Sequence, residues 1–306
     1  MILEIKQLNK RFDKQQVLKD INLEIEQGQI ISILGRSGSG KSTLLNIIAG
    51  FEKANSGSLH MNGQVIFDKK KNTEPQDRKI GFVFQNYALF PHLTVEGNLL
   101  FGVKNKKDKT LVKELLELVD LEGYEKKYPH ELSGGEQQRI SIARVLATDP
   151  DIILLDEPFS SVDTLLKTQI EKDLLQIILK SGKTAIFVTH DPKEAMAISD
   201  KIAFLENSEI VQYDTAQNIY YQPKTKSVAS FFGIANFIED KCYRLNQITL
   251  DKHEGMYKAK IDHAIFRGEY YELHINVMVD RKQYPFVVFD YHDFHKEQEF
   301  YISLLK

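Results

Sequence analysis

The chain has 306 residues, a length that predicts two domains, and its 42% hydrophobic and 27% charged residues are typical of a soluble globular protein. Its net charge of −3 gives no sign of the basic surface that nucleic-acid binding requires, so we expect no nucleic-acid partner. The single cysteine, Cys242, excludes an internal disulfide framework and a cysteine-rich metal site, and it fits a reducing compartment.

The N-terminal stretch "MILEIKQLNKRF" mixes charged and apolar residues and has no continuous apolar core, so we expect no signal peptide there. No run of 18 or more apolar residues occurs, so we expect no segment that spans a bilayer. If the protein works at a membrane, a partner must hold it there.

In chain order, short apolar strands alternate with amphipathic helices, and this alternation predicts a mainly parallel sheet covered by helices. Strands are predicted at residues 2–8, 16–28, 29–35, 56–67 (a hairpin turning at Asn62-Gly63), 79–85, 150–158, 184–190 and 200–214. Helices are predicted at residues 42–52, 165–182 and 191–199, and the whole segment 86–147 has a helical pattern.

After about residue 236 the pattern changes to short alternating strands with few helical signals, as in "HAIFRGEYYELHINVMV". We therefore predict an α/β domain over residues 1–235, with a helical subdomain over about 86–147, and a small all-β accessory domain over residues 236–306.

The stretch "GRSGSGKS" (Gly35–Ser42) fits the phosphate-binding loop G-x-x-x-x-G-K-[ST], with a buried strand before it and an amphipathic helix after it. Glycines let the backbone wrap phosphates, Lys41 reaches the β- and γ-phosphates, and Ser42 ligates Mg²⁺. The alternative is an ordinary glycine-rich turn, which the flanking elements disfavour. The predicted nucleotide contacts are Gly35, Arg36, Ser37, Gly38, Ser39, Gly40, Lys41, Ser42 and Thr43.

Polar side chains also end three other predicted strands. "IILLDEP" places Asp156 where it can hold Mg²⁺ and Glu157 where it can polarise an attacking water, although "DEPFS" can also open a helix. Gln85 can touch Mg²⁺ or the water, and His190 can donate a hydrogen bond to a γ-phosphate. Read alone, Gln85 and His190 are more simply explained as structural strand-end residues.

Two further motifs resemble nucleotide-binding or anion-binding sequences. "NKKD" (Asn105–Asp108) fits a guanine-reading motif, but no D-x-x-G lies between the phosphate loop and it, so we reject GTP. "ELSGGEQQR" (Glu131–Arg139) places two glycines at the start of a strong helix and so forms a second anion site.

Taken together and in this order, "GRSGSGKST", Gln85, "LSGGEQQR", "IILLDEP", "SSVD" and "TH" resemble the nucleotide-binding subunit of ATP-binding-cassette (ABC) transporters over residues 1–235. The resemblance implies ATP and Mg²⁺ as cofactors, with Ser42, Gln85 and Asp156 at the metal. It also implies a head-to-tail homodimer, in which ATP lies between the phosphate loop of one copy and the signature "LSGGE" of the other.

Within that resemblance, Ser133, Gly134 and Gly135 would meet the γ-phosphate bound by the second copy. Glu157 would be the catalytic base, with Lys41, Gln85 and His190 beside the γ-phosphate. Nearby contacts would come from Asp163, which crosses the dimer interface, and Phe12, which stacks on adenine.

The departures from the family pattern are small. Arg36 replaces a frequent proline, Glu136 stands where glutamine often follows the two glycines, and "SSVD" replaces the usual "SALD". None removes a catalytic group, so we expect an active ATPase.

The same resemblance implies that segment 86–147 grips integral membrane permease subunits, which would place the chain peripherally at the cytoplasmic face of the membrane. "LFPHLTV" is typical of importers that use an extracytoplasmic binding protein, and the tail resembles the oligonucleotide-fold-like (OB-like) accessory domain of such subunits. "IAGFE" and "FFGIANFI" favour ferric iron as cargo, while polyamine, sulfate or molybdate, and sugar stay open. Five histidines lie in the tail, but their spacing makes no ligand set for iron.

Two other classes of function compete with transport. Soluble ABC-type ATPases that act on DNA or ribosomes usually carry two cassettes or a long coiled coil, and this chain has one cassette and no sustained heptads. A catalytically dead binding module is disfavoured by the intact set of Lys41, Asp156, Glu157 and His190.

Overall fold

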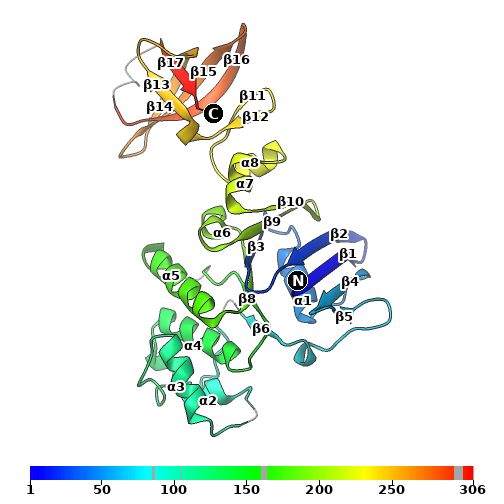
Figure 1. Ribbon diagram of the computed structural model, residues 1–306. Helices are drawn as coiled ribbons and strands as arrows, with labels where there is room; N and C mark the ends of the chain where they lie inside the picture. The colour runs from blue at the N-terminus through cyan, green and yellow to red at the C-terminus, as the bar shows by residue number, and fades with distance from the viewer. Residues whose placement is uncertain (85–86, 104, 160–163, 293–298, 306) are drawn as a thin grey trace. The chain divides into compact units, whose positions relative to one another are not determined.

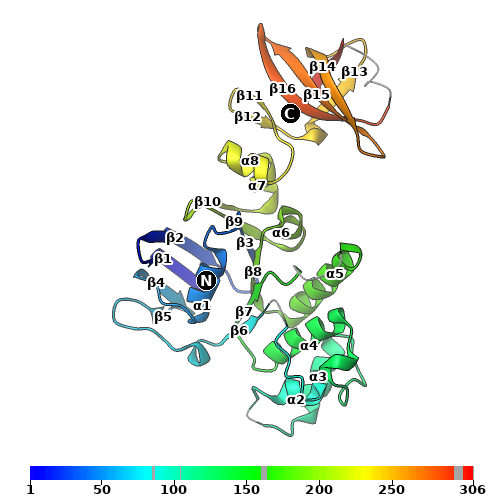
Figure 2. The same ribbon diagram turned by 180° about the vertical axis from the view of Figure 1, so that it is seen from behind.

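The structure is a computed structural model that describes residues 1–84, 87–103, 105–159, 164–292 and 299–305 (Figures 1 and 2). The chain forms two compact units, Met1–Ala216 and Gln217–Lys306.

The first unit is built around a six-stranded sheet in the order β10-β9-β3-β8-β7-β6, in which only β10 and β9 pair antiparallel. The mainly parallel sheet expected from the sequence is therefore confirmed. The strands are β3 (Ile30–Leu34), β6 (Ile80–Val83), β7 (Ile152–Asp156), β8 (Thr184–Thr189), β9 (Lys201–Glu206) and β10 (Glu209–Asp214).

The central strands β3, β7 and β8 of this sheet are buried on both faces, which explains why they are almost continuously apolar. Along β7, Ile152 and Leu154 pack into one hydrophobic core, whereas Ile153 and Leu155 pack into the other. The strand ends therefore carry the polar residues, and Asp156 is the last residue of β7.

A second sheet is antiparallel, in the order β2-β1-β4-β5, and shares the first core with α1. Its β4–β5 hairpin turns at Asn62 and Gly63, which have φ of 50° and 73°, as a two-residue type I′ turn needs. The strands are β1 (Leu3–Phe12), β2 (Gln15–Ile25), β4 (Ser56–Met61) and β5 (Gln64–Phe67).

The helices of the first unit cover both faces of the large sheet. Figures 1 and 2 show α2, α3 and α4 gathered together within the segment predicted as a helical subdomain, and they contribute to the second core with α5. The helices are α1 (Lys41–Ala49), α2 (Val95–Leu100), α3 (Lys109–Leu118), α4 (Gly134–Leu146), α5 (Thr164–Ser181) and α6 (Pro192–Ile198).

The second unit contains a five-stranded antiparallel sheet in the order β13-β17-β14-β15-β16, with its own core and a β11–β12 pair. The β accessory domain expected from the sequence is therefore present. Its strands are β11 (Asn236–Ile238), β12 (Lys241–Tyr243), β13 (Ile248–Asp251), β14 (Tyr257–Phe266), β15 (Tyr271–Val279), β16 (Lys282–Asp290) and β17 (Glu299–Leu304).

The compact units divide at residue 216, earlier than the domain boundary predicted at 235. Two short helices, α7 (Ala216–Tyr221) and α8 (Lys226–Phe231), precede the β-strands. The fully buried Arg244 ties them to the strands by donating to the backbone carbonyls of Tyr220, Ala229 and Gly233. Contacts of this kind, from a buried guanidinium to helix-end carbonyls, are not signalled by sequence periodicity.

Within the described part of the chain, no helix has both the length and the apolar character needed to cross a membrane.

Candidate functional site

The phosphate-loop residues form the turn between β3 and α1. At Gly35 a Cβ would lie 2.2 Å from the Leu205 carbonyl oxygen, and at Gly40 the backbone has φ of 104° and runs against Val17. Only glycine fits both positions. The loop is therefore closely packed against β9 and β2, with the first turn of α1 directly after it.

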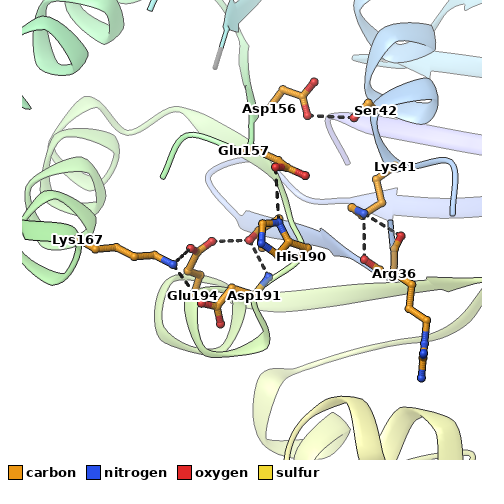
Figure 3. A network of polar contacts seen from close by, with 11 residues as sticks. Arg36, Lys41, Ser42, Asp156, Glu157, Lys167, His190, Asp191 and Glu194 are labelled. Atoms are coloured by element: carbon orange, nitrogen blue, oxygen red, sulfur yellow. Dashed lines mark hydrogen bonds and ion pairs between the residues drawn. The ribbon is translucent and has the colours of Figure 1, made fainter. Parts of the chain in front are cut away.

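Lys41, the first residue of α1, folds back over this loop. Its ammonium donates to the carbonyl oxygens of Gly35 at 2.9 Å and Arg36 at 3.1 Å, as Figure 3 shows. Burial lowers the pKa of Lys41, while Glu157 and Asp156 oppose that shift. The Arg36 side chain extends away from this ammonium, so its carbonyl rather than its guanidinium is part of the arrangement.

Ser42 and Asp156 meet at the carboxyl end of the sheet, although 114 positions separate them. The Ser42 hydroxyl donates to Asp156 Oδ1 at 3.2 Å. Burial raises the pKa of Asp156 and the neighbouring Glu157 adds to the rise, while the Ser42 hydrogen bond opposes it. The two residues thus form a pair of hard oxygen donors whose negative charge is only partly compensated.

Glu157 follows β7 with an unusual backbone. Its φ is 45°, a left-handed value that is costly for a residue with a Cβ, and its N–H donates to the Val188 carbonyl at 3.0 Å. Its carboxylate lies 3.5 Å from His190 Nδ1, which comes from the end of β8. The strained turn therefore aims the carboxylate at the strand-end histidine and away from the sheet.

A cavity of about 210 Å³ brings several of these residues together. Its lining combines the phosphate loop, the first turn of α1 and Glu157, with Val17 of β2 as the apolar wall. The lining residues are Val17, Ser37, Gly38, Gly40, Lys41, Ser42, Thr43 and Glu157. Nearby, the buried Ser39 hydroxyl has no hydrogen-bond partner in the described structure. A polar cradle with spare donors is what a polyphosphate chain requires.

A network of ion pairs and hydrogen bonds, which the sequence pattern does not reveal, fixes the residues on either side of His190. Lys167 of α5 reaches Asp191 Oδ2 at 3.1 Å and Glu194 Oε1 at 2.5 Å, and Glu194 also accepts from the Thr189 hydroxyl (Figure 3). The Asp191 N–H in turn donates to Thr189 Oγ1 at 3.0 Å. The residues on both sides of His190 are therefore fixed to α5 and α6, while the imidazole itself is 61% exposed.

Phe12 ends β1 as an exposed aromatic ring. The Lys10 ammonium lies 4.5 Å from the ring centroid and is itself fixed by Glu52 at 2.7 Å and the Lys53 carbonyl at 2.8 Å. An exposed ring supported in this way can stack on a base, and the role of Phe12 at adenine stays a prediction.

The signature residues start α4, and none of the described ones lines the phosphate-loop cavity. Ser133 is the N-cap and is exposed, as is Gly134. Figures 1 and 2 both place α4 apart from α1 within the first unit. The phosphate loop and the signature segment are therefore separate within this chain.

Two predicted site residues, Gln85 and Asp163, lie outside the described residues. No cluster of three or more His, Cys, Asp or Glu suited to a metal occurs among the residues that the structure describes.

This chain is similar in sequence to proteins of known function. The ABC transporter family matches residues 18–160. The Fe(3+) ions import ATP-binding protein FbpC of Haemophilus influenzae (strain 86-028NP) is 43% identical over 237 residues, which cover 76% of this chain and 68% of that protein. The spermidine/putrescine import ATP-binding protein PotA of Clostridium novyi (strain NT) is 39% identical over 309 residues, which cover 89% of this chain and 87% of that protein.

Solved structures agree with the fold. The cbiO1 protein of Clostridium perfringens, part of the transporter complex cbiONQ, has a TM-score of 0.65 and 29% identity, covering 71% of this chain and 90% of its own. A dimeric ATP-binding cassette bound to ADP and Pi in a post-hydrolysis state has a TM-score of 0.58 and 33% identity, covering 70% of this chain and 99% of its own.

Proposed function

Because the chain belongs to the ATP-binding subunits of ABC transporters, we propose that it hydrolyses ATP to energise a binding-protein-dependent importer, with ferric iron as its cargo. The observation that carries this proposal is the cavity in which the phosphate loop, Lys41, Ser42 and Glu157 converge. The chain would act peripherally, at the cytoplasmic face of the membrane.

The geometry supports separate roles for these residues in ATP hydrolysis. The loop N–H groups and the N-terminus of α1 receive the phosphates, and Lys41 exchanges its two loop carbonyls for phosphate oxygens. Glu157 accepts the proton of the attacking water, and His190, 3.5 Å away, orients that carboxylate and donates to the γ-phosphate.

The residues present also fit Mg²⁺. Ser42 and Asp156 offer a hydroxyl and a carboxylate oxygen, and burial raises the pKa of Asp156, so a cation there stabilises the ionised carboxylate. Ser42, Asp156 and Gln85 would hold the ion, which when bound neutralises charge on the β- and γ-phosphates. One protein carboxylate is typical, since Mg²⁺ takes its other ligands from phosphate and water.

The separation of the two anion sites supports a site shared between two copies. Ser133 is exposed at the α4 N-terminus, where it can meet phosphate held by the loop of a second copy. The similar cassette bound to ADP and Pi is itself a dimer. Asp163 would lie in the same interface.

A permease partner fits an exposed aromatic cluster of the first unit. The rings of Phe51 and Phe82 have centroids 5.3 Å apart, and those of Phe82 and Phe84 have centroids 4.6 Å apart. Phe51 is 52% exposed and Phe84 is 42% exposed. Clustered exposed aromatics mark contact surfaces, and this one ends immediately before Gln85. We therefore place the permease contact there and on the helical subdomain.

The cargo is tested by measuring substrate uptake in the host organism after the gene for this chain has been deleted. Wild-type chain is expected to restore uptake of labelled ferric iron, and Glu157→Gln, which keeps the fold and the nucleotide contacts, is expected not to. Restored spermidine uptake instead would assign the polyamine role, which the longer match to PotA favours as the alternative. Restoration of no import at all would contradict transport by this chain.

Lys167 is expected to act as a positioning residue for His190. Burial opposes ionisation, yet the ion pairs prevail, raising the pKa of Lys167 and lowering the pKa of Asp191. Lys167→Met should lower kcat for ATP roughly tenfold by displacing the His190 loop, with KM for ATP nearly unchanged. Steady-state kinetics check this, and Lys167→Arg should recover most of kcat. An equal loss in the arginine variant would show that the ion pairs do not position His190.

A further inference from the structure

The carboxylate of Glu136 is surrounded by hydrogen-bond donors at the start of α4. It accepts from the Ser133 N–H at 2.7 Å, from the Ser133 hydroxyl at 2.8 Å and from the Tyr124 hydroxyl at 2.8 Å. The Glu136 N–H donates to Ser133 Oγ at 3.4 Å, which completes a capping box.

These contacts occupy both donors that Ser133 could offer to a phosphate, its N–H and its hydroxyl. A hydroxyl has a single proton, and that of Ser133 is donated to Glu136 Oε2. To donate to an incoming phosphate oxygen, Ser133 must first release the carboxylate. The carboxylate also compensates the positive end of the α4 dipole, which would otherwise be available to the phosphate.

The carboxylate stays charged under all ordinary conditions. Hydrogen bonds from the Ser133 N–H, the Ser133 hydroxyl and the Tyr124 hydroxyl lower the pKa of Glu136 to about 2. Its pKa lies far below neutrality, so no physiological pH change releases the Ser133 proton. Only a competing anion does so.

We propose that Glu136 is an internal competitor of ATP for the Ser133 hydroxyl, and that it sets the ATP concentration at which two copies close around the nucleotide. The inference rests on the proposed shared site. Glu136 is a positioning residue in this account, because it acts through Ser133 and does not itself bind the nucleotide.

The test measures ATP-driven dimerisation by sedimentation velocity in a Glu157→Gln background with Mg²⁺, where ATP is consumed slowly. Adding Glu136→Gln keeps the side-chain shape and removes the charge, and should lower the half-maximal ATP concentration roughly three- to tenfold. Glu131→Gln is the matched control. It removes the same charge from an exposed capping residue that contacts the Tyr128 N–H rather than Ser133, so the midpoint should not move.

A double-mutant cycle shows whether Glu136→Gln changes the ATP midpoint through the Ser133 hydroxyl. In a Ser133→Ala background, most of the gain from Glu136→Gln should disappear, because the hydroxyl for which the carboxylate competes is gone. The ratio of the midpoints of the Glu136→Gln variant and its parent should stay constant between about pH 6 and pH 9, since the carboxylate of the parent remains ionised throughout.

Two outcomes would overturn the proposal, and they are distinguishable. Dimerisation with equal midpoints for the Glu136→Gln variant and its parent, or an unreduced gain in the Ser133→Ala background, would contradict the competition alone. A parent that stays monomeric at saturating ATP would contradict the shared site and the competition with it.

Discussion

Glu157→Gln is expected to reduce the rate of ATP hydrolysis by roughly 10²–10⁴-fold, the range that a general base contributes. Glutamine keeps the length and the hydrogen-bonding shape of the side chain but cannot take a proton from water. The backbone at this position is held at φ of 45° by its own N–H bond to Val188, so the turn should be retained. Single-turnover hydrolysis measures the rate directly.

ATP binding provides the control for this variant. The phosphate contacts come from the loop and from Lys41, which Glu157→Gln does not alter, so the equilibrium constant for ATP binding should change less than about threefold. Lys41→Ala should have the complementary defect and lose affinity. A Glu157→Gln variant that hydrolysed at the wild-type rate would show that another group is the base.

Arg78→Met is expected to destabilise the first unit by about 3–5 kcal/mol, the cost of removing one partner from a buried charged network. Arg78 is 2% exposed and donates to the carbonyls of Ile47 at 2.7 Å and Ile48 at 2.9 Å, which belong to the last turn of α1. It also donates to the Thr73 carbonyl at 2.8 Å. Methionine fills similar space but leaves these acceptors buried without their donor.

Calorimetry should resolve this loss because the two units need not unfold together. The transition of the first unit is the one that ATP shifts upward, and its midpoint should fall in Arg78→Met. Lys69→Met, which removes a cation from an exposed position, should change the stability by less than about 0.5 kcal/mol. Equal midpoints for Arg78→Met and wild type would mean that Arg78 does not cap α1.

The parts of the site that could be predicted from the sequence are those whose chemistry lies in a contiguous motif. The loop at Gly35–Ser42 needs a strand before it and a helix after it, and both are readable from local periodicity. Asp156 and Ser42, 114 positions apart, are predicted to lie together because both suit Mg²⁺, and the structure brings them into hydrogen-bond contact.

The parts that escaped prediction depend on long-range contacts between residues that are ordinary in their local sequence. Lys167 looks like one more charged residue on an amphipathic helix, and its partner Asp191 looks like a helix cap. Arg78 and Arg244 carry no local signal of burial, yet each is buried and donates to helix-end carbonyls. Such partners are set by tertiary packing and leave no periodic signal.

The shared ATP site is the central claim, and sedimentation of Glu157→Gln with Mg²⁺ and ATP tests it most directly. We predict monomers without nucleotide and dimers with ATP. Once Ser133→Arg is added, the chain should stay monomeric while still binding ATP. A chain that remains monomeric at saturating ATP, or that dimerises as readily with Ser133→Arg as without it, would contradict a site shared between two copies.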